Sequence, residues 1–553
     1  MCSIRLREGI LKTKDTVIDY SKKKFLVIDD FMDMRSMIKH MVESYGVTKV
    51  DTAANGESAI ELLAKNSYDI MLCDYNLGDG MDGQQVLEEA KHKNLLKFST
   101  AVIMITAENT REMVMGAVEY QPDDYLSKPF NKHMLRDRLE KVVAKKSDFE
   151  TIERAIDKQK YAEAIVLCEQ RIKEKPKNLS EFIRLSADLY MKLGKYDDAA
   201  RIFKGVLATR DISWAQLGLG KTCFYNDSFM EAREIFESII SENETYMEAY
   251  DWLGKTMIKL GDLNEAENVI KSAVEKSPKA ILRQMALGDI ALKKKDFSVA
   301  EKAFKKAVTL GKHSVHKNPA NYTNQAKALA FNSSGKDAVK VIAKLRKEFP
   351  DDKDASLHAA MAENVVYKEM GKDDAAEKAF DEAQSLYSEI GDKAASDISV
   401  EMAQVFYANG EKDKGSEIIK KIVQNQHEDE DALKDIQDVF TSMGMEDEGK
   451  EIITTSKEGV IKLNNEGVQL GKQGKLDEAI NLFEKALEEL EGNKVINLNL
   501  VRVLLSAMEK NGKDDSQLYK ARQCMLRVEK IDPLNNSIPG LRDRYDKIMQ
   551  KAS

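Results

Sequence analysis

Cysteine, proline and long apolar runs are scarce in this chain of 553 residues, and each scarcity excludes a class of protein. The five cysteines lie far apart in the sequence, which argues against a disulfide framework and suits a reducing compartment. No apolar run reaches the roughly 20 residues that cross a bilayer, and the first residues lack the apolar core of a signal peptide. We therefore expect a cytoplasmic protein with no membrane insertion.

Positive charge is also in deficit. Lys and Arg number 85 against 94 Asp and Glu, which gives a formal net charge of −9. Because proteins that bind nucleic acids usually carry an excess of positive charge, no nucleic-acid partner is expected. Eight prolines and two tryptophans beside 32% charged residues are typical of a helix-rich protein. The length exceeds what one hydrophobic core usually serves, so several domains or a repeat array are expected.

Between residues 23 and 146, short apolar runs alternate with amphipathic helical patterns. The predicted strands cover residues 24–30, 47–53, 68–74, 101–107 and 123–129. Five strands alternating with helices predict an α/β fold, with a parallel sheet covered by helices on both faces. In such folds, ligands bind at the carboxyl ends of the strands.

Three carboxylates, a hydroxyl and an ammonium group are expected to meet at that edge of the sheet. The first strand ends in Asp29 and Asp30, and the third ends in Asp74. The fourth strand ends at Thr106, and the fifth runs into Lys128. Three like charges at close range need a cation, and an all-oxygen ligand set favours Mg²⁺. The predicted chemistry is phosphoryl transfer to a carboxylate, with the lysine and the hydroxyl available to bind the anion.

The segment from about residue 24 to 145 resembles the CheY-like receiver domains of bacterial two-component signalling. The resemblance rests on the paired acids, the aspartate that ends "MLCD", the Thr-Ala pair in "ITA", and "KPF" with an aromatic before its lysine. It implies a flavodoxin-like domain with strand order 2-1-3-4-5. One departure is the loop after Asp74, "NLGDGMDG", which is rich in glycine, lacks the family's usual proline and is one residue longer.

The resemblance implies that Asp74 is the phospho-acceptor and that Mg²⁺ binds beside it. Asp30 and Asp74 would ligate the ion directly, and Asp29 mainly through water. The backbone carbonyl of Asn76 would complete the protein ligands, and Mn²⁺ is a possible substitute for Mg²⁺.

Other residues are implied to bind the phosphoryl group or to respond to it. The implied phosphoryl-binding and switch residues are Thr106, Ala107, Lys128 and Tyr125. Tyr125 is the aromatic that swings inward on activation, and Asn76 and Glu108 stand at the positions that tune dephosphorylation. The Lys128–Pro129 bond is expected to be cis.

Residues 147–553 show helical periodicity without a strand pattern. Ser147 and Glu150 fit a capping box, which predicts that a new helix begins just after the receiver. No linker rich in Gly, Ser or Pro intervenes, so the two parts are expected to be docked closely. The predicted organisation is an N-terminal extension of unknown order over 1–22, a receiver domain over 23–146 and a helical array over 147–553.

A repeat of about 34 residues runs through the array, and it is strongest over 180–310 and 464–490. Segments such as "GKYDDAARIF" (194–203) and "GDLNEAENVI" (261–270) place a small residue where paired helices cross. The pattern resembles the tetratricopeptide family and predicts about eleven helix pairs in a superhelix with a concave groove. The expected crossing residues include Ala199, Ala232, Ala266, Ala300, Ala376 and Ala479.

The segment "HSVH" at 313–316 suggests a pair of metal ligands. No cysteine or acidic cluster stands near it in the sequence, so we interpret it as a solvated loop between repeats.

These features predict a response regulator whose output is protein binding. A sensor histidine kinase would phosphorylate Asp74, and the change at Thr106 and Tyr125 would reach the repeats through the fourth helix, fifth strand and fifth helix. The partner in the repeat groove is unknown, and a homodimer through the receiver or the repeats is a further option. Beyond self-catalysed phosphorylation and dephosphorylation, no enzyme activity is expected.

Two other functions stay open at this point. The chain could be a phosphate sink or decoy that inhibits phosphotransfer to another regulator, because the residues at the dephosphorylation positions match those of receivers with short-lived phosphates. It could also be a scaffold with a vestigial receiver, but the full set of acids and the lysine argue against that interpretation.

Overall fold

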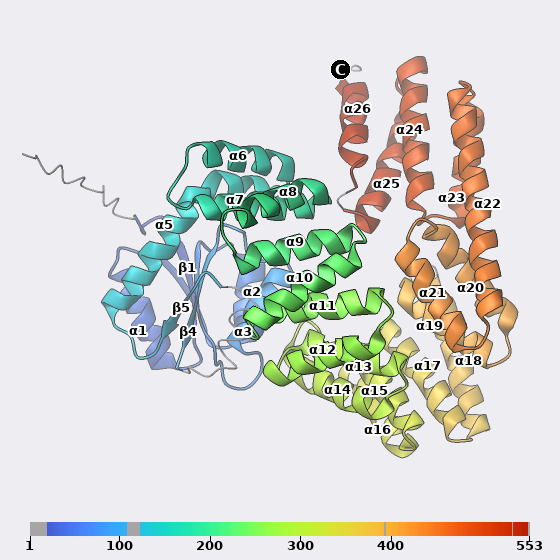
Figure 1. Cartoon of the computed structure of the whole chain (residues 1–553), viewed down its shortest axis with the longest axis horizontal. Helices are drawn as coiled ribbons and strands as arrows, with labels where there is room; N and C mark the ends of the chain where they lie inside the picture. The colour runs from blue at the N-terminus through green and yellow to red at the C-terminus, as the bar shows by residue number, and fades with distance from the viewer. Residues whose placement is uncertain (1–18, 108–121, 392–393, 534, 551–553) are drawn as a thin grey trace, which may run out of the picture. The chain divides into compact units, whose positions relative to one another are not determined.

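The computed structural model describes residues 19–107, 122–391, 394–533 and 535–550, and Figure 1 shows it as a ribbon. The chain divides into two compact units, Met1–Ala328 and Leu329–Ser553. Among the described helices, none has both the length and the apolar character that a membrane span requires.

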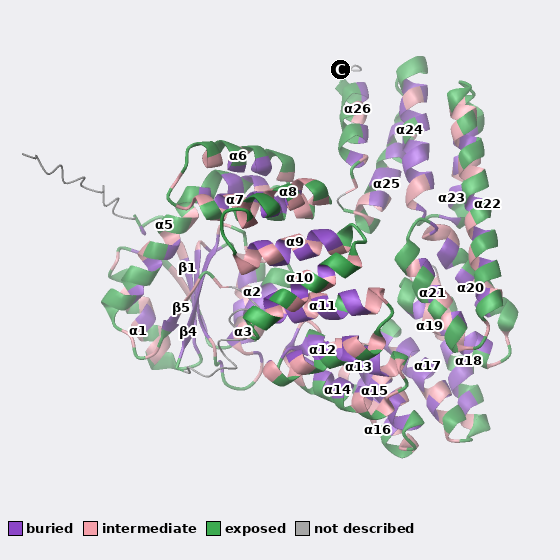
Figure 2. Ribbon diagram, viewed as in Figure 1, coloured by how far each residue is buried: buried purple, intermediate pink, exposed green. Residues whose placement is uncertain are grey.

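The first unit opens with five parallel strands in the order β2-β1-β3-β4-β5. The strands are β1 (Lys24–Ile28), β2 (Lys49–Ala53), β3 (Ile70–Asp74), β4 (Ala101–Thr106) and β5 (Asp124–Ser127). The predicted fold class and strand order are therefore confirmed. Strands β3 and β4 are buried along their whole length, as expected for a sheet covered on both faces, and Figure 2 shows the buried strands in purple.

Helices cover the two faces of the sheet in pairs (Figure 1). The helices are α1 (Met32–Glu43), α2 (Gly56–Lys65), α3 (Gly83–His92) and α5 (Lys132–Asp157). Side chains of α1 and α5 share one hydrophobic cluster with the sheet, and side chains of α2 and α3 share another. The helix predicted between the fourth and fifth strands lies outside the described residues.

Helix α5 corrects the prediction that a new helix begins at Ser147. The helix runs unbroken from Lys132 to Asp157, so the last receiver helix and the first helix of the array are one element. The Ser147 hydroxyl donates to the carbonyl of Ala144 at 2.7 Å, a bond typical of a helix interior. The capping pattern was misleading because a serine inside a helix can satisfy its hydroxyl in this way.

The second half of α5 is bound to the receiver. Lys146 Nζ donates to the carbonyl of Phe98 at 2.7 Å, and the Phe98 N–H donates to the Asp157 carboxylate at 2.9 Å. Lys146 also pairs with Asp123 at 3.2 Å and with the buried Glu153 at 3.8 Å. The receiver and the first repeat are thus docked without an intervening linker.

Antiparallel helix pairs follow in the first unit. They are built from α6 (Tyr161–Lys173), α7 (Leu179–Lys192), α8 (Tyr196–Leu207), α9 (Ser213–Tyr225), α10 (Phe229–Glu242), α11 (Met247–Lys259), α12 (Leu263–Lys276), α13 (Ile281–Lys293) and α14 (Phe297–Leu310). A 3₁₀ turn (Gly311–His313) leads toward α15 (Pro319–Phe331), within which the division between the units falls.

Small residues lie where the paired helices cross. The six alanines expected at crossings are all buried, with at most 2% exposure. A methyl group on Gly288 would lie 2.6 Å from the ring of Phe304, and one on Gly254 would lie 2.5 Å from Ile270. Glycine at these positions lets an aromatic or branched side chain of the second helix reach the backbone of the first.

The second unit continues the pattern, and several of its helices are longer than those of the first unit. Its helices are α16 (Gly335–Glu348), α17 (Lys353–Glu369), α18 (Asp373–Ile390), α19 (Ser396–Ala408), α20 (Lys412–Asn425), α21 (Glu430–Ser442), α22 (Glu446–Lys472), α23 (Leu476–Glu489), α24 (Lys494–Asn511), α25 (Asp515–Ile531) and α26 (Ile538–Gln550). Helix α22 serves two neighbouring repeats, because Gly449 faces Phe440 of α21 and Gly467 faces Phe483 of α23.

Substitution of a crossing glycine should destabilise the first unit. Gly288→Ala forces its new methyl group against the buried Phe304 ring, so we expect a loss of about 1–3 kcal/mol in the free energy of unfolding. Gly205→Ala is the matched control, because Gly205 lies inside helix α8 with nothing within 4 Å of the added methyl. It should gain about 0.5–1 kcal/mol. Urea denaturation followed by circular dichroism measures both, and equal effects would contradict the crossing model.

Glu153 should make stability depend on pH. Burial raises the pKa of its carboxyl to about 7, although Lys146 opposes the shift. In the unfolded chain the pKa is near 4.5, so folding becomes less favourable as the pH rises from about 4.5 to 7. Glu153→Gln should therefore raise the unfolding temperature by roughly 2–4 °C at pH 8 and leave it unchanged at pH 4.5. Glu150→Gln, at a more exposed site on the same helix, should show no such difference.

Candidate functional site

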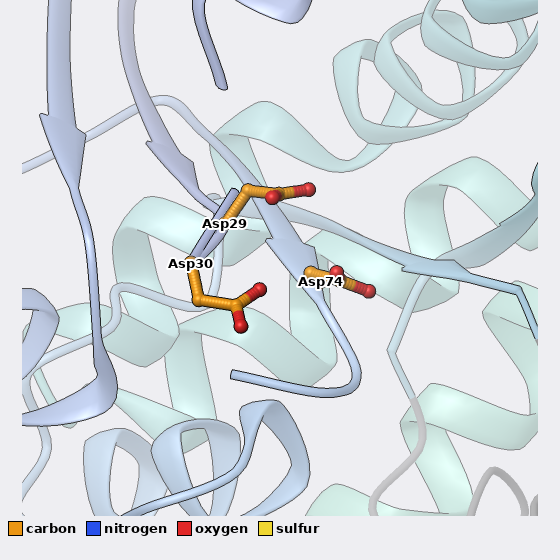
Figure 3. A group of neighbouring side chains, drawn as sticks. All are labelled: Asp29, Asp30 and Asp74. Carbon is orange, nitrogen blue, oxygen red and sulfur yellow. The ribbon is translucent and has the colours of Figure 1, made fainter. Parts of the chain in front are cut away.

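Three carboxylates come together at the carboxyl edge of the sheet. Asp29 and Asp30 follow strand β1, and Asp74 ends β3. The two strands are parallel neighbours with Ile28 opposite Cys73, so the residues that follow these two lie side by side. Oxygens of the three side chains lie within 4.8 Å of one another, and Figure 3 shows them gathered beyond the strand ends.

Lys128 is the cation that faces this group. Its Nζ donates to Asp74 Oδ2 at 2.7 Å and to Asp29 Oδ2 at 3.0 Å. Asp29 is fully buried, and Asp74 is 6% exposed. Burial raises the pKa of Asp74, and Lys128 opposes part of that rise. Burial lowers the pKa of Lys128, but its bonds to the two carboxylates outweigh burial and leave the pKa raised.

The charges of this site fit a divalent cation. Among the described residues, the three carboxylates outnumber the ammonium group of Lys128 and the guanidinium of Arg35, which bonds the Asp29 carbonyl, so negative charge is in excess at a largely buried position. An all-oxygen set of this kind suits Mg²⁺ better than a softer metal. Asp30 is exposed, so the cluster is open to solvent on one side.

The glycine-rich loop approaches the acids closely. Gly78 has a φ of +74°, and a methyl group on it would lie 3.1 Å from Asp30 Oδ2. Glycine is the residue that adopts this conformation without a steric penalty. The backbone of Asn76 donates a hydrogen bond to Asp74, and the exposed Asn76 side chain accepts from the Gly78 N–H at 3.2 Å.

The structure also positions the residues expected to contact a phosphoryl group. Thr106 ends strand β4, is 2% exposed, and accepts a backbone bond from Lys128 at 2.6 Å. Ala107 follows it and is exposed. Tyr125 lies on β5, half-buried against the hydrophobic cluster of α2 and α3, and burial raises its pKa. The Lys128–Pro129 bond is cis, and Glu108 lies outside the described residues.

Sequence reasoning missed two residues that frame the site. Arg35 Nη1 donates to the carbonyl of Asp29 at 2.5 Å, and Glu57 Oε1 accepts from the Met81 N–H at 3.3 Å. The place of Arg35, on the first helix after the paired acids, was a sequence signal that could have predicted its contact with Asp29. No sequence signal predicts the contact of Glu57, because it joins the start of a helix to a loop 24 residues away.

The network around Lys128 should be necessary for stability at neutral pH. Lys128→Met leaves the buried Asp29 carboxylate without its cation, so we expect a loss of about 3 kcal/mol in the free energy of unfolding. Lys141→Met removes an exposed lysine that lies 3.9 Å from Asp124, and it should change the value by less than about 0.5 kcal/mol. Urea denaturation at pH 7 compares the two variants. Similar losses of unfolding free energy in the two variants would show that the buried ion pair of Lys128 with Asp29 stabilises the fold no more than an exposed pair.

Comparisons with known proteins agree with the two kinds of domain that the fold shows. Residues 25–140 match the response regulator receiver domain, and residues 183–212 and 253–314 match tetratricopeptide repeats.

Two chemotaxis proteins are among the similar relatives. The chemotaxis protein CheY of Pseudomonas aeruginosa is 32% identical over 119 residues, which are 22% of this chain and 94% of that protein. CheY-3 of Vibrio cholerae is 33% identical over 119 residues, which are 22% of this chain and 90% of that protein.

Among solved structures, CheY4 of Vibrio cholerae is 29% identical, with 22% of this chain and 98% of that chain covered and a TM-score of 0.21. The C-terminal part of a TPR repeat-containing protein from Cytophaga hutchinsonii is 19% identical. The match covers 45% of this chain and 97% of that chain, with a TM-score of 0.36. By the identity and coverage of the curated relatives, the chain belongs to the CheY-like response regulator receiver family, with its receiver domain joined to a tetratricopeptide repeat array.

Proposed function

We propose that this chain is a response regulator in which a sensor histidine kinase phosphorylates Asp74, and that the state of Asp74 controls protein binding by the repeats. The observation that carries the proposal is the cluster of Asp29, Asp30 and Asp74 with Lys128 bonded to two of them. The complete cluster, with its lysine in place, argues against a vestigial receiver.

The transfer uses the Asp74 carboxylate as the nucleophile. One of its oxygens attacks the phosphorus of a phosphohistidine, an O–P bond forms, and the N–P bond to the kinase breaks. Lys128 offers positive charge to the incoming phosphoryl oxygens, and the Thr106 hydroxyl is a hydrogen-bond donor at the neighbouring strand end.

The metal-binding residues of the proposed site are Asp30 and Asp74 as direct ligands, Asp29 through water and the carbonyl of Asn76. Mg²⁺ bound there would neutralise negative charge shared by the carboxylates and the phosphoryl group. The excess of negative charge at the cluster supports this assignment.

The repeats are proposed to carry the output. Stacked tetratricopeptide pairs offer a surface for a protein partner, and Tyr125 lies on β5 next to α5, the helix that continues into the array. A change at Tyr125 and Thr106 is therefore proposed to alter either the docking of the array or access to its groove.

Phosphorylation should depend on Asp74 and on a divalent ion. Incubation with acetyl phosphate and Mg²⁺ should add one phosphoryl group to the full chain, measured by intact mass, and a chelator should prevent it. Asp74→Asn should abolish the modification because the amide is no nucleophile. Asp79→Asn is the matched control, since Asp79 is an exposed acid of the same loop and no member of the carboxylate cluster.

Retention of the modification in Asp74→Asn, or its equal loss in Asp79→Asn, would contradict the assignment of the acceptor. Small-angle scattering with beryllofluoride, which stands in for the phosphoryl group, then tests the output. A change of size or shape that is absent from Asp74→Asn supports control of the repeats. If beryllofluoride binds and the size and shape of the protein do not change, the result would favour a phosphate sink.

A further inference from the structure

A second contact between the receiver and the repeats lies on helix α3, far in sequence from α5. The residues of α3 that face the repeats recur every three or four positions, so they form one stripe along the helix. They are Gln85, Glu88 and His92. The opposite side of α3 packs into the receiver core through Val86, Leu87 and Ala90. Helix α3 therefore lies between the sheet and the repeat array.

Glu88 is the centre of this contact. Its side chain is 6% exposed, and its Oε2 accepts from the Ser314 hydroxyl at 2.8 Å. Its Oε1 lies 3.2 Å from His316 Nε2. The Glu88 and Ser314 side chains are 226 positions apart, and Ser314 is 7% exposed. Burial of a carboxylate is costly without such partners, so this geometry depends on the repeats being docked.

Weaker contacts flank this centre on both sides. Gln85 Nε2 lies 3.5 Å from the carbonyl oxygen of Leu310 at the end of α14. The His92 and His316 rings lie 6.2 Å apart in an edge-to-face arrangement. At the start of α3, burial raises the pKa of Asp82, its bonds from the Gln85 and Gln84 backbone oppose that rise, and the charges of Glu88 and Lys279 act in opposite directions.

We call the contact of Glu88 with Ser314 and His316 the α3 clasp. It corrects the interpretation of "HSVH" as a solvated loop. Ser314 is buried and His316 is partly buried, because the array folds back onto a receiver helix.

The other end of α3 is fixed to the phospho-acceptor. A methyl group on Gly83, the first residue of α3, would lie 1.9 Å from the carbonyl oxygen of Asp74. The Gly83 N–H donates to the carbonyl of Tyr75 at 2.9 Å. The start of α3 is in direct contact with the backbone of Asp74 and Tyr75, so a shift of the helix displaces the end of β3 or breaks these contacts.

We propose that the α3 clasp holds Asp74 in the position that binds Mg²⁺ and the phosphoryl group. Closure of the clasp and binding of a phosphoryl group at Asp74 then favour each other. This inference rests on the proposed phosphorylation of Asp74, and it adds a route to the repeats that is separate from Tyr125 and α5. Because coupling between two sites is reciprocal, the clasp strengthens binding at Asp74 to the same extent that binding at Asp74 strengthens the clasp.

The test breaks the clasp from the repeat side, where no receiver residue is changed. The double variant Ser314→Ala/His316→Ala removes the hydroxyl and the imidazole that make the α3 clasp with Glu88 in the full chain. Lys312→Ala is the matched control, since Lys312 is an exposed residue of the same connection. Calorimetry measures the affinity of each protein for beryllofluoride in the presence of Mg²⁺, and hydrogen exchange measures the protection of α3 and residues 310–317.

We expect the double variant to bind beryllofluoride about fivefold or more weakly than the wild-type chain and to exchange faster over α3, while Lys312→Ala matches the wild type. In the wild type, beryllofluoride with Mg²⁺ should slow exchange over residues 310–317, and this effect should be absent from Asp74→Asn.

Three outcomes would overturn this inference and leave the proposed phosphorylation of Asp74 intact. The first is unchanged protection of α3 in the double variant. The second is faster exchange of α3 in that variant with an affinity for beryllofluoride within about twofold of wild type, and the third is tighter binding of beryllofluoride than in the wild type. The last would show that the clasp opposes the site. If the wild-type chain binds no beryllofluoride with Mg²⁺, the proposed phosphorylation itself fails, and the inference falls with it.

Discussion

The burial of negative charge at the edge of a parallel sheet is the constraint on which the receiver half depends. Asp29 and Asp74 lie side by side because β1 and β3 are parallel neighbours, and burial removes them from most of the solvent that would screen them. Lys128, brought by the end of β5, binds both. Since one ammonium group leaves the cluster negative, the site is suited to a divalent cation and to an anion that arrives with it.

The array depends on a different constraint, which is the close crossing of helices. Gly254 and Gly288 leave room for a branched or aromatic side chain of the paired helix, and the alanines at the crossings are buried for the same reason. Because each pair buries its apolar face only against its neighbours, the array extends by stacking. The same packing rule allows a helix to be shared between repeats, since the long helix α22 completes one repeat and begins the next.

The two constraints meet in the first unit, where two elements connect the receiver with the repeats. Helix α5 is a continuous rod whose second half is bound to the receiver by Lys146 and Asp157. Helix α3 instead joins the backbone of Asp74 to Ser314 and His316 through side-chain contacts. In the proposed switch, α5 is the continuous link and the α3 clasp is the contact that responds to Asp74.

The sequence by itself determined the five strands, the polar residues at their carboxyl ends and the period of the repeats. These follow from local patterns: strand ends of a parallel sheet share one edge, and a small residue every 34 positions or so marks a helix crossing. The tertiary structure alone decided two other features. Ser147 can satisfy its hydroxyl at a helix start or inside a helix, and in the folded chain α5 continues through it with its second half bound to the receiver. Glu88 meets Ser314, 226 positions away, and also His316, and no local pattern encodes a contact made by the path of the whole array.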